Sequence, residues 1–278
     1  MADILASGAF TSGSLGLIGC GNMGAAVARG AIAAKLLPPQ RVFAYDAEPA
    51  AVRSLETLGC RPAASPEELL RQADIIVLAV KPQVFQSLAG EWKKAFSSLR
   101  NKTLLSVMAG IKAARLREVF PDSFTVIRVM PNLGLSVGEG VTAIASDGIP
   151  DTSLALAESV FRSSGQTVRV SEDQMDAVTG LSGSGPMYVF EFIEALTEAG
   201  VDSGLPRETA YRLALQTAKG SVKLLETSSE PPPAWSTRVR SPGGTTEKAQ
   251  QVLEKEGFHA ILGRAVQAAV ARSKELSG

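Results

Sequence analysis

Short apolar runs alternate with longer amphipathic stretches over residues 14–171 of the chain. Apolar runs of about four to eight residues are typical of buried strands, whereas apolar residues spaced three and four apart are typical of helices. Because strands and helices alternate, we expect a parallel sheet covered by helices. Strands are predicted at 15–18, 42–45, 75–79, 104–107, 125–129, 141–145 and 167–170, and helices at 24–34, 66–72, 113–119 and 153–161.

The pattern changes after Glu172, where strand signals stop. The rest of the chain is predicted to form helices at 187–199, 207–225, 247–256 and 260–275, separated by Gly, Pro and Ser. We therefore predict two domains, an α/β domain at 14–171 and an all-helical domain at 172–278. The prolines at 231–233 are predicted to form a stiff connector.

The predicted helix at 187–199 is apolar around most of its circumference. Such a helix must be buried on more than one side. A second subunit would bury it most easily in a small domain, so we expect the helical domain to form dimers. A central core helix of a monomer is the alternative that periodicity leaves open.

The composition argues against a nucleic-acid-binding protein, a membrane-spanning protein and a zinc-binding protein. The 278 residues are 45% hydrophobic, with 28 basic and 28 acidic residues, so no overall charge attracts nucleic acid or an anionic membrane. No apolar stretch approaches the roughly 20 residues that span a bilayer. The two cysteines, Cys20 and Cys60, are too few and too far apart for a zinc cluster, which favours a reducing cytoplasm. Residues 1–13 lack the basic residues of a signal or transit peptide, so we expect a frayed terminus.

A glycine-rich motif, GxGxxG, joins the first predicted strand to the first predicted helix. Its glycines permit a sharp turn, a close approach of a pyrophosphate and tight packing of helix on sheet, and the helix start binds the phosphates. This context predicts a Rossmann-type dinucleotide-binding domain rather than an ordinary tight turn. The predicted cofactor-binding residues here are Gly19, Cys20, Gly21, Asn22, Met23 and Gly24.

Asp46 ends the second predicted strand, roughly 20 residues after the motif, where an acidic residue binds the adenosine ribose of NAD. A carboxylate at this position would repel a 2′-phosphate, so we predict that NADH is favoured over NADPH. Arg41 and Arg53 are possible confounders, and a turn or helix N-cap is the alternative role of Asp46.

The residues after the strand at 75–79 should also face the cofactor, because open α/β sheets bind ligands at the carboxyl ends of their strands. A lysine at the end of a strand is otherwise usually a solvated surface charge, which is the alternative interpretation of Lys81. The predicted contacts are Ala79, Val80, Lys81 and Pro82.

Two further segments of the helical half are unusual: 181–186, with sequence LSGSGP, and 241–247, with sequence SPGGTTE. The second combines bare amides, hydroxyl groups and a helix start, which suits a small carboxylate. Simple N-capping by Thr245 or Thr246 is the alternative.

Together these motifs resemble pyrroline-5-carboxylate reductases. The resemblance extends over nearly the whole chain after the first residues and includes GCGNMG, AVKP, Met130-Pro131-Asn132, DAVTGLSGSGPMYVF and SPGGTT. It implies a reductase of Δ1-pyrroline-5-carboxylate in proline biosynthesis that uses NAD(P)H, as a homodimer or a ring of dimers with intertwined helical domains.

The resemblance also implies roles for individual residues. Met108 and Ala109 would lie near the nicotinamide. Ser241, Gly244, Thr245 and Thr246 would hold the substrate carboxylate, with Ser241 and Thr246 as the catalytic residues and Thr246 bound to the ring nitrogen. Glu172 would also touch the substrate.

The chain departs from the family at three places. Leu133 and Gly134 follow Asn132 where Thr and Pro are usual, and Asp46 replaces a small or hydroxylated residue. Residues 235–238 (WSTR) stand where the family usually has Leu-Lys/Arg-Asp and a neutral residue. Arg238 could pair with a second carboxylate, so a reductase of a related cyclic imino acid is the nearest alternative. A non-catalytic nucleotide-binding protein is the alternative from another class.

A ketone or alcohol substrate is disfavoured. No tyrosine has a lysine four residues later, and no asparagine follows Asn132, so the acid groups of two carbonyl-reducing families are missing. An imine can be protonated before hydride arrives, and its reduction therefore depends on orientation more than on a strong acid.

Overall fold

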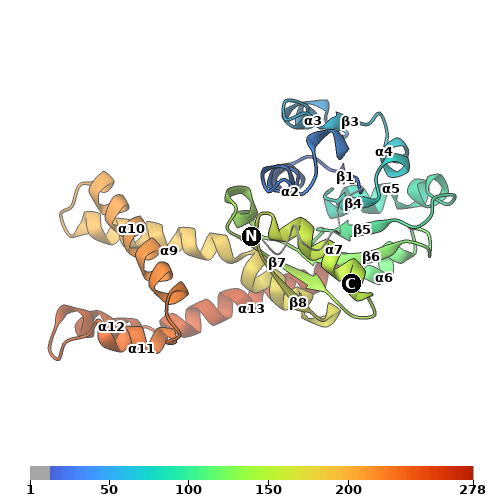
Figure 1. Ribbon diagram of the computed structural model, residues 1–278. Coiled ribbons are helices and arrows are strands. Elements are labelled where there is room, and N and C mark those ends of the chain that lie inside the picture. The colour runs from blue at the N-terminus through green and yellow to red at the C-terminus, as the bar shows by residue number, and fades with distance from the viewer. Residues whose placement is uncertain (1–12, 278) are drawn as a thin grey trace. The chain divides into compact units, whose positions relative to one another are not determined.

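The structure is a computed structural model that describes residues 13–277. The expected frayed terminus at 1–13 lies outside the described residues except for Gly13. The chain forms two compact units, one of residues 13–184 and 269–277, the other Gly185–Ala268 (Figure 1). The domain boundary after Ser171 stays a prediction: the compact units divide at Ser184.

The first unit is built on one eight-stranded sheet with strand order β3-β2-β1-β4-β5-β6-β7-β8. The first six strands are parallel, β7 is antiparallel to β6, and β8 is parallel to β7. The strands are β1 Leu15–Ile18, β2 Val42–Tyr45, β3 Arg61–Pro62, β4 Ile75–Leu78, β5 Thr103–Ser106, β6 Thr125–Met130, β7 Gly140–Ala145 and β8 Gly165–Val170. The predicted Rossmann-type sheet is confirmed, and β3 is the strand that the pattern did not predict.

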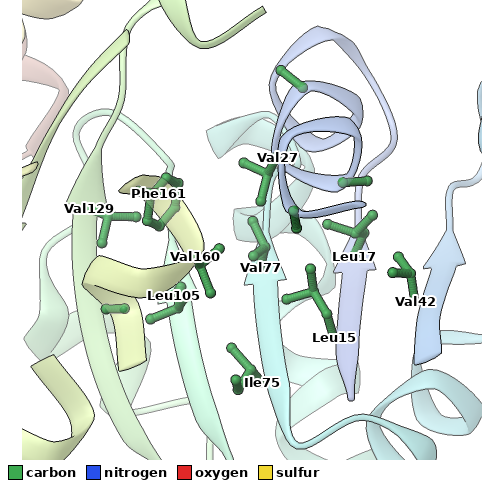
Figure 2. Packing of buried hydrophobic residues seen from close by; sticks show 14 of the residues in the cluster. Leu15, Leu17, Val27, Val42, Ile75, Val77, Leu105, Val129, Val160 and Phe161 are labelled. Atoms are coloured by element: carbon green, nitrogen blue, oxygen red, sulfur yellow. The ribbon is translucent and has the colours of Figure 1, made fainter. Parts of the chain in front are cut away.

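One face of the sheet is covered by α2 (Asn22–Ala33), α3 (Pro49–Glu56) and α7 (Asp151–Arg162). Figure 2 shows Val27 of α2 and Phe161 of α7 directed toward the strand residues of this face. The small side chains of α2, including Ala28 and Ala31, are fully buried and let the helix lie close to the sheet.

The opposite face is covered by α4 (Pro66–Gln72), α5 (Pro82–Ala95) and α6 (Ala113–Arg117). Its centre is an aromatic cluster of Phe85, Trp92, Phe96, Phe120 and Phe124. Helix α5 was not predicted, although Pro82 at its start and apolar residues three and four apart at 85, 89, 92 and 96 are helix signals.

The first unit also contains the segment after β8. It runs through η3 (Glu172–Gln174), α8 (Met175–Val178) and a π-helical turn, η4 (Thr179–Gly183). Met175 is buried against β7 residues Ala143 and Ala145, which explains why this segment belongs to the sheet unit. Two short 3₁₀ turns, η1 (Pro39–Arg41) and η2 (Leu133–Val137), complete the unit.

The second unit is helical, as predicted. It contains α9 (Gly185–Asp202), α10 (Arg207–Glu226), α11 (Pro232–Arg238), α12 (Thr245–Lys255) and the first part of α13 (Phe258–Ser277). The proline segment is not only a connector: Pro231 caps α11 and Pro232 begins it, because a proline at the first helical position loses no hydrogen bond. Among the described residues no helix could cross a membrane.

Candidate active site

The glycine-rich loop between β1 and α2 is packed too closely for side chains at two of its three glycines. Gly19 has a φ of +98°, and a Cβ there would lie 2.5 Å from the carbonyl oxygen of Ala79. A Cβ at Gly24 would overlap the carbonyl oxygen of Gly19. Gly21 is different, because a Cβ there would meet nothing within 4 Å. The space beside Gly21 is open to a ligand.

The start of α2 has the features of an anion site. Its N-cap residue is Gly21, no side chain caps it, and no acidic residue lies in its first turn. The amides of Asn22, Met23 and Gly24 have no acceptor within the helix, since the first intrahelical bond runs from the amide of Ala25 to the oxygen of Gly21. Free amides and the positive helix end together fit a pyrophosphate.

A cavity of about 410 Å³ lies at the carboxyl ends of the parallel strands, within the size range of small-molecule sites. Seven of the residues predicted to bind the cofactor surround it: Met23, Ala79, Val80, Lys81, Pro82, Met108 and Ala109. The strand order explains this proximity, because β4 and β5 are adjacent and end at the same edge of the sheet.

The cavity also has walls that were not predicted as site residues. These are Val107, Met130, Pro131, Asn132, Leu133 and Gly183. The Oδ1 atom of Asn132 accepts hydrogen bonds from the amides of Gly134 (3.2 Å) and Val141 (3.3 Å), and its Nδ2 lies 3.5 Å from the Ser182 hydroxyl. The Met-Pro-Asn and LSGSGP motifs had signalled these segments, but only as marks of the family.

Asp46 is part of the glycine-rich loop's own hydrogen bonding. One carboxylate oxygen accepts a 2.7 Å hydrogen bond from the amide of Cys20, and the other a 2.9 Å bond from the amide of Glu48. The second bond is the turn role considered above. The N-cap position of α3 is occupied by Glu48 and not by Asp46. These two bonds hold the carboxylate of Asp46, which therefore lies against the motif, at the end of β2.

Cys20 is a packing residue. Its side chain is buried, and burial together with the nearby Asp46 carboxylate raises the pKa of the Cys20 thiol to about 12. A thiol that stays protonated at neutral pH is neither a nucleophile nor a good metal ligand. No cluster of metal-ligating side chains occurs within residues 13–277.

Glu172 does not line the cavity. Its Oε1 accepts hydrogen bonds from the buried Arg128 guanidinium (2.8 Å) and from the amide of Ala113 (3.1 Å). The antiparallel pairing of β7 on β6 explains this position, since β8 then ends toward the sheet edge where β1 to β6 begin. Within this unit Glu172 has a structural partner, and its predicted substrate contact stays a prediction.

The second predicted site lies in the second unit, at the start of α12. Gly244 is the N-cap residue, and neither Thr245 nor Thr246 caps the helix with its side chain. A Cβ at Gly244 would meet the hydroxyl and carbonyl oxygens of Ser241. Gly243 has a φ of +70°, and its amide donates a 2.8 Å hydrogen bond to Glu247. The exposed hydroxyls at 241, 245 and 246 surround a helix start, as the motif predicted.

Arg238, in contrast, is already engaged within its own unit. Its guanidinium donates to Glu230 and lies over the Trp235 ring, 5.0 Å from the ring centroid. This pairing fixes α11 to the segment before it. The Arg238 charge is therefore compensated without a substrate carboxylate.

The fold and the cavity define a class: a nicotinamide-dependent oxidoreductase with a dinucleotide-binding sheet domain and a helical second domain. Residues 14–110 match the family model "NADP oxidoreductase coenzyme F420-dependent", and residues 172–276 match "Pyrroline-5-carboxylate reductase dimerisation". The chain belongs to the pyrroline-5-carboxylate reductase family.

Individual relatives support the same assignment. A pyrroline-5-carboxylate reductase of Arabidopsis thaliana is 40% identical, with 95% of each chain aligned. One of Synechocystis is 41% identical over 94% of this chain and 97% of its own. The crystal structure of Plasmodium falciparum pyrroline carboxylate reductase with NADP bound has a TM-score of 0.84 and 35% identity, covering 96% of this chain and 99% of that one.

Proposed function

We propose that the protein reduces Δ1-pyrroline-5-carboxylate to proline with a reduced nicotinamide dinucleotide. The proposal rests mainly on the cavity beside the uncapped start of α2. The similarity of the chain to this reductase family over nearly all of its length supports it. The glycine geometry fits the dinucleotide, because the open space at Gly21 is where a pyrophosphate must approach the backbone.

Different residues of the first unit bind the phosphates, the adenosine ribose and the nicotinamide of the dinucleotide. The amides of 22–24 at the start of α2 hold the phosphates, and Asp46 binds the adenosine ribose. The loops at 79–82 and 107–109, with Met23, line the cavity that receives the nicotinamide. The bound dinucleotide supplies hydride to the imine carbon.

The substrate is held by the start of α12. Its free amides and the Ser241 and Thr245 hydroxyls bind the carboxylate, which also gains from the positive helix end. The Thr246 hydroxyl bonds the ring nitrogen and orients the ring, and the nitrogen is protonated before reduction. Orientation of this kind supplies much of the rate when the electrophile is already activated.

We further propose that NADH is preferred over NADPH. The Asp46 carboxylate lies at the end of β2 against the loop of the motif, where it would repel a 2′-phosphate. Asp46→Asn keeps an acceptor oxygen but removes the charge, so the ratio of kcat/KM for NADPH to that for NADH should rise about tenfold, as loss of roughly 1.4 kcal/mol of repulsion would give. An unchanged ratio would remove Asp46 as the determinant.

The active form is proposed to be a homodimer or a ring of dimers. Helix α9 exposes a set of apolar side chains that a second copy would bury: Met187, Val189, Phe190, Phe192 and Leu196. We also place the protein in a reducing cytoplasm, on the ground that its two cysteines are free.

A steady-state assay tests the proposal. Purified protein should oxidise NADH with Δ1-pyrroline-5-carboxylate and yield proline, identified by mass spectrometry, and a six-membered imino acid serves as the matched alternative substrate. Faster turnover of the six-membered ring would support the alternative reductase. Tight dinucleotide binding without turnover of either imine would instead support a non-catalytic protein.

A further inference from the structure

The loop after β5 lies against the end of the chain's last helix. This loop, 107–112, carries Met108 and Ala109 to the cavity and then turns at Gly110, which is buried and has a φ of +73°. A Cβ at Gly110 would lie 2.8 Å from the Leu276 Cβ and 3.1 Å from the Leu276 carbonyl carbon and oxygen. The last turn of α13 therefore rests directly on the backbone beside the cavity, and both segments belong to the first unit.

The same helical turn is fastened to a second segment near the cavity. The Ser273 hydroxyl donates a 2.6 Å hydrogen bond to Oδ1 of Asp176. The Ser277 hydroxyl lies 3.2 Å from the same atom and shares its proton with the Ser273 carbonyl oxygen at 2.9 Å. Ser273 is only 3% exposed, so its hydroxyl depends on this acceptor. Asp176 lies on α8, which leads into the π-helical turn η4, and Gly183 at the end of η4 lines the cavity.

We propose that Gly110 and Asp176 are positioning residues of the dinucleotide site, through which the last turn of α13 holds two of its walls. This inference rests on the proposed function, since it takes the cavity at 79–82 and 107–109 as the nicotinamide site. Met108 and Ala109 immediately precede Gly110, so a shift at Gly110 moves them. Such walls must be held to about 0.5 Å for productive geometry.

The first test compares two alanine substitutions at glycines with the same backbone conformation. Gly110→Ala adds both the strain of a positive φ and the contact with Leu276. Gly148→Ala adds the strain alone, because Gly148 has a φ of +67° in an exposed turn and a Cβ there meets nothing within 4 Å. We expect Gly110→Ala to raise the Kd and KM for NADH and to lower kcat/KM by on the order of tenfold to a hundredfold. Gly148→Ala should keep wild-type values.

The second test removes the hydrogen bond between Ser273 and Asp176 and leaves Gly110 unchanged. Asp176→Ala should weaken NADH binding in the same direction, and Asp176→Asn, which keeps an acceptor oxygen, should restore it. Asp173→Ala is the matched control, because Asp173 is an exposed acidic residue of the same segment. The Kd is read from NADH fluorescence, and the melting temperature of every variant is measured alongside.

The results separate this proposal from the proposed function. If folded Gly110→Ala and Asp176→Ala bind NADH as their controls do, the positioning role is wrong. If Gly110→Ala does not fold, the Asp176 series alone decides. A wild-type protein that binds NADH but reduces no imine would overturn the proposed function while the comparison of Kd values still stands. A wild-type protein that binds no dinucleotide would overturn both.

Discussion

At the scale of single residues, one motif contains three glycines that are required for different reasons. Position 19 requires glycine because φ is positive and a side chain would collide with Ala79. Position 24 requires glycine because a side chain would collide with Gly19. Gly21 has ordinary dihedral angles as an N-cap residue and open space around its Cα. Folding explains the first two glycines, and only a ligand explains the third.

This difference makes a prediction for Gly21→Ala. The fold should be unaffected, with a stability within about 0.5 kcal/mol of wild type, because the added methyl group meets no protein atom. The Kd for NADH should rise at least tenfold, as expected when about 1.4 kcal/mol of phosphate contact is lost. Calorimetry and fluorescence titration measure the two quantities.

Gly90→Ala is the control for this prediction, since Gly90 lies in α5 and an added Cβ there also meets nothing within 4 Å. It should bind NADH normally. Normal NADH binding by Gly21→Ala as well would mean that the pyrophosphate lies elsewhere.

Thr246 carries a second prediction at this scale. Loss of its hydroxyl in Thr246→Ala should lower kcat/KM, with a rise in the corresponding activation free energy of about 1.5–3 kcal/mol, the range for one charge-assisted hydrogen bond. Thr246→Ser keeps the hydroxyl and should retain most of the activity. A wild-type rate for Thr246→Ala would show that the ring nitrogen has another partner.

At the scale of elements, the antiparallel direction of β7 determines at which end of the sheet the residues after β8 lie. The ion pair between Arg128 on β6 and Glu172 after β8 joins these strands across the sheet, with an Arg128 side chain only 6% exposed. A buried guanidinium without its carboxylate is costly, so the pair maintains the position of the segment that leads to η4.

Glu172→Gln should therefore destabilise the fold by about 1–3 kcal/mol in urea unfolding, and the KM for the imino acid tests the predicted substrate contact of Glu172 separately. Glu91→Gln, at an exposed position of α5, should change neither quantity. A KM raised without loss of stability would show that the Glu172 side chain contacts the substrate, and its pairing with Arg128 would then not be its main role.

At the scale of the whole molecule, the second unit buries little of its own apolar surface. Thr197 is the buried residue of α9, whereas Phe190 and Val189 are 58% and 52% exposed. Exposed apolar side chains in this density mark an association surface. The match of residues 172–276 to a dimerisation family agrees with that interpretation.

Phe190→Glu should accordingly convert the protein to monomers and abolish activity, because a buried unpaired charge opposes association. Size-exclusion chromatography with light scattering measures the mass. Leu58→Glu, at an exposed apolar position of the first unit, should remain associated and active. Monomers that keep full activity would show that the site is complete within one chain.

The local pattern of the chain was sufficient for the sheet, the glycine-rich loop and the division into an α/β and a helical part. Strand burial, helix periodicity and turn residues are properties of neighbours in sequence, and here they agree with the fold. The helices α3, α5, α8 and α11 were not predicted, although α3, α5 and α11 each begin at a proline, which is a helix-start signal.

Tertiary structure alone decided the remaining walls of the cavity and the partners of the charged residues. Asn132 and Gly183 reach the cavity only because β6 and η4 end beside it, and Glu172 meets Arg128 because β7 runs against β6. Likewise Leu276 lies on Gly110 although the whole helical unit, Gly185–Ala268, lies between them in sequence. Contacts of this kind depend on strand order and direction, which a periodic pattern of apolar residues does not encode.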